Sequence, residues 1–183
     1  MAVLEIVKYG DPILHKKCKP VEDFSNVGTI VSDMFDSMYE AEGIGLAANQ
    51  VGINLNLFVV DVTHTEEADE SYVFINSSII ESSSNKSSSS EGCLSLPNIS
   101  LDIDRPDRIK LRYQNIDGDW CEDDFSGLLG RAIQHENDHV NGVMIIDRVS
   151  ETEKIKHKTE LKKLEINFNK HIKYNLERKE SPL

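Results

Sequence analysis

The sequence predicts an α+β fold, in which antiparallel or mixed β-sheets pack around a central buried helix and a further helix forms the C-terminus. Three observations support this prediction. Apolar residues recur at helical spacing between Leu128 and Val140, on more than one side of the predicted helix, which is typical of a buried helix. Several segments between residues 56 and 123 carry strand patterns. Residues 151–178 are highly charged but keep one apolar stripe, which indicates a surface helix.

The length and composition of the chain indicate one globular domain. It has 183 residues, of which 39% are hydrophobic and 28% charged, values that suit a single domain with a sizeable core. We expect residues 1–150 to form the main body of this domain and residues 151–183 to extend it as a helix. The sequence shows no apolar run of the roughly 20 residues that span a bilayer and no signal-peptide pattern at its start. We therefore expect a cytoplasmic protein that makes no contact with a membrane.

Charge is distributed unevenly along the chain. The net charge is −12, which argues against a DNA or RNA partner held by bulk electrostatics. Residues 151–183 contain nine Lys or Arg and six Asp or Glu, a balance of 9 − 6 = +3, so the remainder carries −12 − 3 = −15. The predicted C-terminal helix is thus a basic appendage on an acidic body.

The first predicted elements are a turn and a helix. After a short apolar start at residues 3–7, Gly10-Asp11-Pro12 is a turn signal. Residues 26–42 predict a helix, because apolar side chains return every three or four positions. Residues 43–52 are apolar and punctuated by glycines, a pattern that fits either a tight turn or a wall against which a ligand lies. Gln50 is the polar exception, and its amide is able to donate to a carbonyl oxygen.

The middle of the chain predicts strands and loops. Residues 56–62 read as a buried strand, and residues 63–70 as a polar loop. Residues 72–76 predict a second strand, which residues 77–81 extend. The serine-rich residues 82–90 predict a mobile loop within one domain; the alternative is a linker between two domains.

Two further strands precede the central helix. Alternation of apolar and polar residues predicts strands near residues 101–103 and 109–113. Asp117-Gly118 is a hairpin signal, and residues 120–123 continue the strand pattern. In the C-terminal helix, the apolar stripe consists of Leu161, Leu164, Phe168 and Ile172.

The central helix carries a metal-binding pattern. His135 and His139 are four residues apart, so a helix places both imidazoles on one face, one turn apart. Glu136 follows the first histidine, which completes the His-Glu-x-x-His pattern of metal-dependent hydrolases. A histidine pair on a helix also arises by accident, but the enclosed glutamate favours a site.

The third ligand is predicted to be Cys93. It lies in the segment Glu91-Gly92-Cys93, where the glycine allows a sharp backbone path. A small buried cysteine is the alternative reading. The thiolate is favoured because only Asp147 offers a ligand shortly after the helix, and because a catalytic site of this kind needs a third protein ligand.

Three segments together resemble one enzyme family. They are GIGLAANQ at residues 43–50, EGCLS at residues 91–95 and QHENDHVNG at residues 134–142. This combination is similar to that of the peptide deformylases, which remove the formyl group from the N-terminal formylmethionine of new bacterial proteins. The resemblance extends from the start of the chain to about residue 148, and the C-terminal helix resembles the bacterial type that carries one.

The resemblance implies roles for individual residues. Cys93, His135 and His139 would bind one divalent metal ion, natively Fe²⁺, which Zn²⁺, Ni²⁺ or Co²⁺ can replace. The side chain of Gln50 and the backbone N–H of Leu94 would stabilise the oxyanion, and Glu136 would transfer the proton. The backbone of Gly45 would pair with the peptide as an added strand. The residues expected around the methionine side chain are Ile44, Glu91, Leu128, Arg131, Ala132 and His135.

Two other functions compete with this interpretation. The His-Glu-x-x-His pattern alone also suggests a metallopeptidase, and the basic tail suggests a non-catalytic metal-binding protein on the ribosome. Glu136 and Gln50 argue against the second, because a structural metal site needs neither. As an enzyme, the protein is expected to be monomeric, to act on N-formylmethionyl peptides and to contact the ribosome through its C-terminal helix.

Overall fold

The computed structural model describes residues 2–180, and side chains as far as residue 172. A five-stranded antiparallel sheet has the order β1-β2-β3-β6-β7, and a separate antiparallel pair consists of β4 and β5. The strands are β1 Gly45–Ala47, β2 Leu57–Val60, β3 Tyr72–Ser82, β4 Lys86–Cys93, β5 Leu96–Pro106, β6 Arg108–Gln114 and β7 Trp120–Ser126. The helices are α1 Val27–Glu40, α2 Gly127–Val140, α3 Glu151–Lys156 and α4 Lys158–Glu180, with short 3₁₀ turns at Pro12–His15, Ala48–Val51 and Ile145–Arg148.

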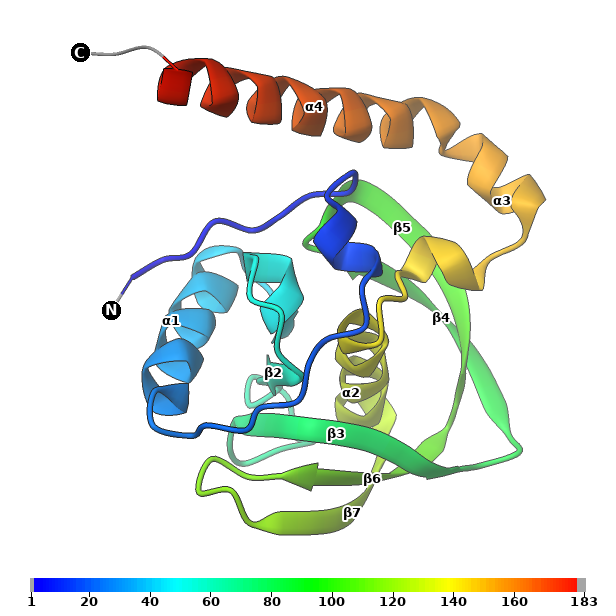
Figure 1. The fold of residues 1–183 in the computed structure, drawn as a ribbon. Coiled ribbons are helices and arrows are strands. Elements are labelled where there is room, and N and C mark those ends of the chain that lie inside the picture. The colour runs from blue at the N-terminus through cyan, green and yellow to red at the C-terminus, as the bar shows by residue number, and fades with distance from the viewer. Residues whose placement is uncertain (1, 181–183) are drawn as a thin grey trace.

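The helix α2 lies in the middle of the fold. Figure 1 shows it between the five-stranded sheet and the β4–β5 hairpin, which curves around one side of the molecule. Eleven of its fourteen residues are buried. Leu129 and Ile133 pack in the same apolar cluster as the aromatic residues Phe58, Phe74 and Phe125 of the sheet. The predicted α+β arrangement, with sheets around a buried helix that carries the His-Glu-x-x-His pattern, is confirmed.

Two other apolar clusters hold the outer elements. Met34 and Met38 of α1 pack with Leu57 and Val59 of β2, on the side of the sheet away from α2. The third cluster joins β5 to the segment that follows α2, and Leu161 and Leu164 of α4 pack against it. The C-terminal helix is therefore docked on the body of the protein through Leu161 and Leu164 of the predicted apolar stripe, whereas Ile172, the last member of that stripe, is 42% exposed.

The N-terminal segment crosses the body beneath α4 (Figure 1). Residues 2–8 adopt neither helix nor strand. Leu4 and Ile6 nevertheless pack against the α1 cluster, while Val7 and Tyr9 pack against the β5 cluster. This short segment thus connects two separate parts of the core.

The serine-rich segment departs from the prediction. We expected residues 82–90 to form a mobile loop, but β4 begins at Lys86 and pairs with β5 in a regular register, such as Ser89 opposite Ile103. The physical reason is that β5 supplies the apolar side chains of this pair. Leu101 and Ile103 are buried, whereas residues 87–90 of β4 are exposed. A strand that contributes backbone hydrogen bonds but little apolar surface carries no hydrophobic pattern to detect.

The C-terminal helix also differs from the prediction. We expected one helix over residues 151–178, but α3 ends at Lys156 and α4 begins at Lys158. The side chain of Ser150 caps α3 by accepting a hydrogen bond from the N–H of Glu153. The last residues of the predicted extension, 181–183, lie outside the described residues. Within residues 2–180, no helix is both long enough and apolar enough to cross a membrane.

Candidate metal centre

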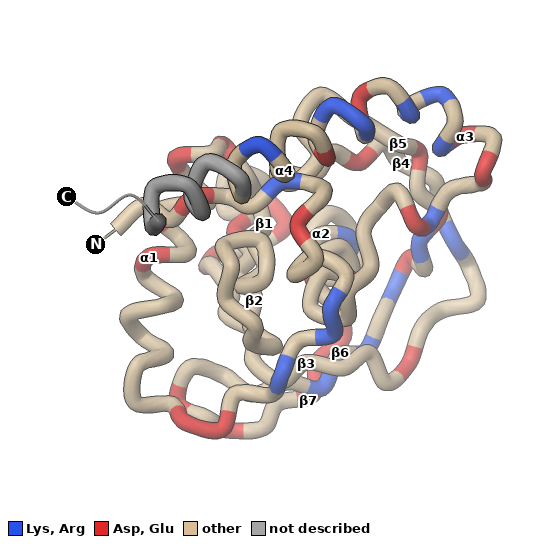
Figure 2. Tube along the Cα trace, turned by 45° about the horizontal axis from the view of Figure 1, so that its top comes forward, with Lys and Arg blue, Asp and Glu red and all other residues tan. Residues whose placement is uncertain are grey.

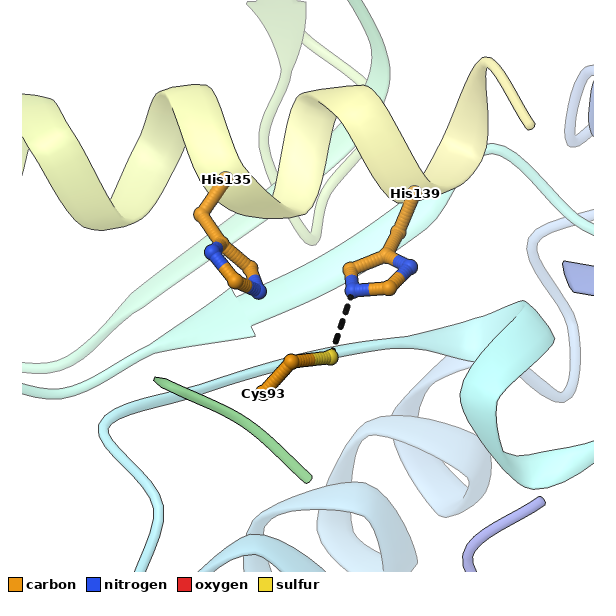
Figure 3. A group of neighbouring side chains, drawn as sticks. All are labelled: Cys93, His135 and His139. Atoms are coloured by element: carbon orange, nitrogen blue, oxygen red, sulfur yellow. Dashed lines mark hydrogen bonds between the residues drawn. The ribbon is translucent and has the colours of Figure 1, made fainter. Parts of the chain in front are cut away.

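Two histidines of α2 face the same space. Because His135 and His139 are one helical turn apart, their side chains leave the same face of α2, as Figure 3 shows. Their ring centroids are 5.1 Å apart, and both residues are buried. The helix thereby places two imidazole nitrogens side by side, as the spacing predicts.

Cys93 completes the group from a different element. It is the last residue of β4, where the chain turns into β5. Its Sγ lies 3.2 Å from Nε2 of His139, and the ligand atoms of Cys93, His135 and His139 all lie within 4.8 Å of one another (Figure 3). In the part of the chain that the structure describes, this is the one group of at least three His, Cys, Asp or Glu side chains with such geometry.

The group suits a transition-metal ion. Bonds of about 2.3 Å to sulfur and 2.0–2.1 Å to nitrogen in a tetrahedral site hold the ligand atoms roughly 3.5 Å apart, close to the 3.2 Å between Sγ of Cys93 and Nε2 of His139. One thiolate and two imidazoles favour iron, cobalt, nickel or zinc over magnesium or calcium, which prefer oxygen ligands. Three protein ligands also leave one coordination position open, as in catalytic sites. The residues present therefore fit a catalytic metal ion.

A carboxylate fixes the orientation of the first histidine. Glu91 accepts a hydrogen bond from Nδ1 of His135, with a distance of 3.0 Å to its Oε2. This contact leaves Nε2 of His135 available as a ligand, which is how carboxylates orient metal-binding histidines. Burial opposes ionisation of Glu91, but hydrogen bonds from His135 and Arg105 hold the pKa of this carboxyl well below its usual range. Glu91 is therefore an ionised acceptor.

Two arginines, the buried Arg105 and the half-buried Arg131, bind that carboxylate. Arg105 donates from Nε and Nη2 to the two oxygens of Glu91, at 2.7 and 2.9 Å, and from Nη1 to Asp138 at 2.8 Å. Arg131 also donates to Glu91, at 2.7 Å, and Asp138 forms a second ion pair with Arg148. Arg105 is only 1% exposed, so the paired charges replace the water that it has lost. This network links β4, β5 and α2 behind the metal-binding group.

Glu136 follows His135 in α2, and one of its carboxylate oxygens makes no hydrogen bond to the described residues. It is 4% exposed, and its Oε2 has no hydrogen-bond partner among the described residues. Burial raises the pKa of this carboxyl to about 7, because the low-dielectric surroundings disfavour the charged form. A Cβ on Gly45 would lie 2.5 Å from Oε1 of Glu136. The glycine of β1 is therefore required for the glutamate to occupy this position.

Gln50 directs its amide group toward the site. Its Oε1 accepts from the N–H of Ala47 at 2.8 Å, so the nitrogen must point the other way. Nε2 lies 3.7 Å from Sγ of Cys93 and 3.3 Å from Oγ of Ser95. A donor is thus held beside the ligands without being one of them.

One cavity of about 460 Å³ connects these groups. It is lined by every residue singled out from the sequence except His139, which lies deeper. The predicted residues that line it are Ile44, Gly45, Gln50, Glu91, Cys93, Leu94, Leu128, Arg131, Ala132, His135 and Glu136.

Sequence reasoning missed part of this site. Residues of β5, such as Leu96 and Ile99, also line the cavity. Arg105 and Asp138 were missed as well. The signal for Arg105 was present, because it continues the alternation of Leu101 and Ile103 on the buried side of β5 and places a charge where an apolar residue is expected.

Comparisons with known proteins agree on one family. A family model described as polypeptide deformylase matches residues 3–155. A peptide deformylase of Acidobacterium capsulatum is 47% identical over 151 residues, which cover 82% of this chain and 88% of the relative. One of Chromobacterium violaceum is 45% identical over 166 residues, covering 90% and 98%.

Solved structures show the same similarity. The crystal structure of peptide deformylase from Thermotoga maritima has a TM-score of 0.77 at 42% identity, covering 82% of this chain and 99% of that chain. Peptide deformylase 1B of Arabidopsis thaliana, in complex with an inhibitor, has a TM-score of 0.86 at 36% identity, covering 92% and 93%. Both the sequence and the arrangement of the elements are therefore shared with these proteins.

Proposed function

This chain belongs to the polypeptide deformylase family, and on that premise we propose that it removes the formyl group from the N-terminal formylmethionine of newly made polypeptides and releases formate. The observation that carries the proposal is the meeting of Cys93, His135 and His139 in one cavity with a buried, unpaired Glu136. A structural metal site has no use for such a carboxylate, whereas hydrolysis of an amide needs a proton acceptor beside water.

The metal ion is proposed to be divalent, one per chain, and natively Fe²⁺, with Zn²⁺, Ni²⁺ or Co²⁺ able to replace it. Cys93, His135 and His139 would hold it. When bound, such an ion supplies Lewis acidity, which polarises a carbonyl group and makes water acidic near neutral pH. The chemistry of the thiolate and imidazole ligands supports this choice of ions.

Glu136 is proposed to be the general base and then the general acid. Its carboxylate takes a proton from the attacking water and passes it to the nitrogen of the leaving amine. Its place in the cavity beside the ligands supports both roles, because a general base must lie within hydrogen-bond reach of the water whose proton it takes. Gly45 leaves free the space that this carboxylate occupies, because a Cβ at that position would contact Oε1 of Glu136 too closely.

Negative charge on the former formyl oxygen is proposed to be stabilised by two donors. One is the side-chain amide of Gln50, whose orientation is set by the N–H of Ala47. The other is the backbone N–H of Leu94, at the turn that follows Cys93. Donors fixed in advance at such positions stabilise the transition state without reorganisation, and one of them typically contributes about 10²–10³ in rate.

The peptide is proposed to bind as an added strand. Gly45 lies in β1, which is at one end of the strand order, so its backbone groups are available for pairing with an extended substrate. The methionine side chain would then enter the cavity between β4 and α2. The proposed pocket residues are Ile44, Glu91, Leu128, Arg131, Ala132 and His135.

The remaining features of the proposal concern the whole protein. Residues 1–150 would form the catalytic part and residues 151–183 a helical extension of the same domain, in a cytoplasmic monomer without a role on DNA or at a membrane.

The extension is proposed to contact the ribosome, because Lys and Arg residues recur along α3 and α4 (Figure 2). Replacing the exposed Lys162 and Lys163 by alanine should weaken co-sedimentation with ribosomes, and undiminished co-sedimentation would remove this part of the proposal.

The activity is tested by measuring formate release from a formyl-Met peptide. We expect release by the metal-loaded protein, loss of release after chelation, and recovery when a divalent ion is returned. Cleavage of unformylated peptides with no action on formyl-Met peptides would instead favour a metallopeptidase. Metal binding without any hydrolysis would contradict the proposal and favour a non-catalytic role.

A further inference from the structure

The N-terminal segment contacts both residues that we propose as oxyanion donors. The backbone N–H of Val7 donates to the carbonyl oxygen of Gln50 at 2.7 Å. The ammonium Nζ of the next residue, Lys8, donates to the carbonyl oxygen of Leu94 at 2.8 Å. Gln50 and Leu94 are 94 − 50 = 44 residues apart in sequence, so a short stretch of chain joins two otherwise separate parts of the site.

A third hydrogen bond extends the pattern to the following residue. The N–H of Tyr9 donates to the carbonyl oxygen of Ser95 at 2.9 Å. Leu94 and Ser95 are the two residues that turn the chain from β4 into β5. We call residues 7–9 the N-terminal clamp, because each of them donates to one carbonyl group, that of Gln50, Leu94 or Ser95.

These bonds restrict the direction of the Leu94 N–H. A peptide group is planar, so the chain between two successive carbonyls can change only through φ and ψ. The bonds from Lys8 and Tyr9 fix the carbonyls of Leu94 and Ser95, which limits rotation in the two-residue turn. The peptide group that carries the Leu94 N–H lies between Cys93, which pairs with Leu96 in the β4–β5 hairpin, and the bonded Leu94 carbonyl. Because both of its neighbours are held, the direction of this N–H is restricted as well.

The clamp is itself held firmly in place. Val7 and Tyr9 pack against the same apolar cluster as Leu96 of β5. Directly after the clamp, a Cβ on Gly10 would lie 3.0 Å from the Cα of Glu165 in α4, so the helix covers the chain at van der Waals distance. The segment therefore acts as a fixed support and not as a free end.

We propose that Lys8 is a positioning residue of the reaction: the N-terminal clamp places Gln50 and Leu94 relative to each other, and Lys8 sets the orientation of Leu94 by holding its carbonyl group. This inference rests on the proposed function of those two donors. Lys8 itself lies outside the lining of the cavity, so it acts on the reaction through the Leu94 carbonyl and not by touching substrate. Its bond is also the one in the clamp that a side-chain substitution removes, because the other two are made by backbone N–H groups.

The test compares three variants. Lys8→Met removes the donor and keeps the apolar stem, Lys8→Arg keeps a donor, and Lys17→Met makes the same change in charge at another exposed lysine. Loss of a direct oxyanion donor costs about 10²–10³ in rate, and an indirect effect is smaller. We expect kcat for formate release to fall about tenfold in Lys8→Met with KM within about twofold of the original. Lys8→Arg should recover most of kcat, and Lys17→Met should match the original protein.

A second measurement separates positioning from loss of stability and does not depend on activity. The amide of Ser95 shares a peptide group with the Leu94 carbonyl, so its NMR resonance should shift in Lys8→Met and return toward its original position in Lys8→Arg. Thermal unfolding should stay within a few degrees in all three variants. An unmoved Ser95 resonance, an unchanged kcat in Lys8→Met, or an equal loss of kcat in Lys17→Met would overturn the inference. If the original protein releases no formate, the proposed function fails, and the Ser95 resonance alone then decides whether the clamp exists.

Discussion

Two parts of this chain are rich in charged side chains, and the fold treats them in opposite ways. In α2, Glu136 and Asp138 are buried, whereas no lysine or glutamate among residues 151–172 of α3 and α4 is buried, as in the pair Lys156–Glu153. Burying a charge costs free energy unless partners replace the lost water, and Asp138 has such partners while Glu136 has none among the described residues. The comparison shows that charges buried despite the cost in free energy lie at the site for which we propose a reaction. A high density of charge along a helix does not by itself indicate such a site.

The largest effect is expected where the buried charge has no partner. Glu136→Gln keeps the size of the side chain and removes the proton acceptor, so kcat should fall by about 10²–10⁴. The fold should be unharmed, because the substitution also removes an ionisable group from a buried position. Formate release and thermal unfolding, measured side by side, check this prediction. An active Glu136→Gln protein would show that the proton acceptor lies elsewhere.

The next effect concerns the buried charges that do have partners. Arg105→Met leaves Glu91 and Asp138 without their shared cation, and breaking such a buried pair costs about 3–5 kcal/mol. Metal affinity should fall about 10–100-fold as well, because Glu91 would hold His135 less firmly. The matched control is Arg108→Met, which removes an exposed ion pair with Asp124 worth at most about 1 kcal/mol. Urea unfolding and metal titration of both variants measure the difference, and equal effects would contradict the comparison.

A smaller effect is expected at the start of α2. The cap residue Ser126 makes no side-chain hydrogen bond to the helix, and Glu67 from the loop before β3 accepts from the N–H of Leu128 at 2.5 Å instead. Glu67→Ala should therefore destabilise the protein by about 1 kcal/mol, as the loss of a helix cap does. The neighbouring exposed Glu66→Ala is the control in the same urea titration, and a loss of stability as large in that variant would exclude capping as the cause.

The smallest effect is expected in the C-terminal helices. Lys156→Ala removes an exposed i,i+3 pair with Glu153, and such pairs contribute only about 0–0.5 kcal/mol. The same urea titration should place this variant within error of the original protein. A loss above about 1 kcal/mol would mean that surface charges in α3 contribute as much as a helix cap, which would weaken the contrast with α2.

Much of the site was predictable because several of its residues lie close together in the sequence, at a spacing typical of metal-binding helices. The separation of His135 and His139 fixes their shared face on a helix, and the enclosed Glu136 identifies the kind of reaction. Cys93 was predictable for a different reason, since the helix lacked a third ligand and few residues were able to supply one. The buried α2 followed from its apolar residues on more than one side.

The rest depended on contacts between segments far apart in sequence. The strand β4 has serines at positions where alternating apolar residues would predict a strand. It needs no apolar residues there, because its partner β5 supplies the buried side chains. The network of Arg105 and Asp138 forms only when β5 lies behind α2. Lys8 meets the Leu94 carbonyl across 86 residues, and no local pattern reports such a contact.

The central claim is that Cys93, His135 and His139 hold one metal ion together, and metal content tests it most directly. The protein and its Cys93→Ala and Cys121→Ala variants are purified without oxygen and analysed for iron, zinc, nickel and cobalt by mass spectrometry. We expect about one ion per chain in the original protein and in Cys121→Ala, and at most about a tenth of that in Cys93→Ala, because two imidazoles alone bind far more weakly than a complete three-ligand site. A full equivalent of metal in Cys93→Ala would contradict the account.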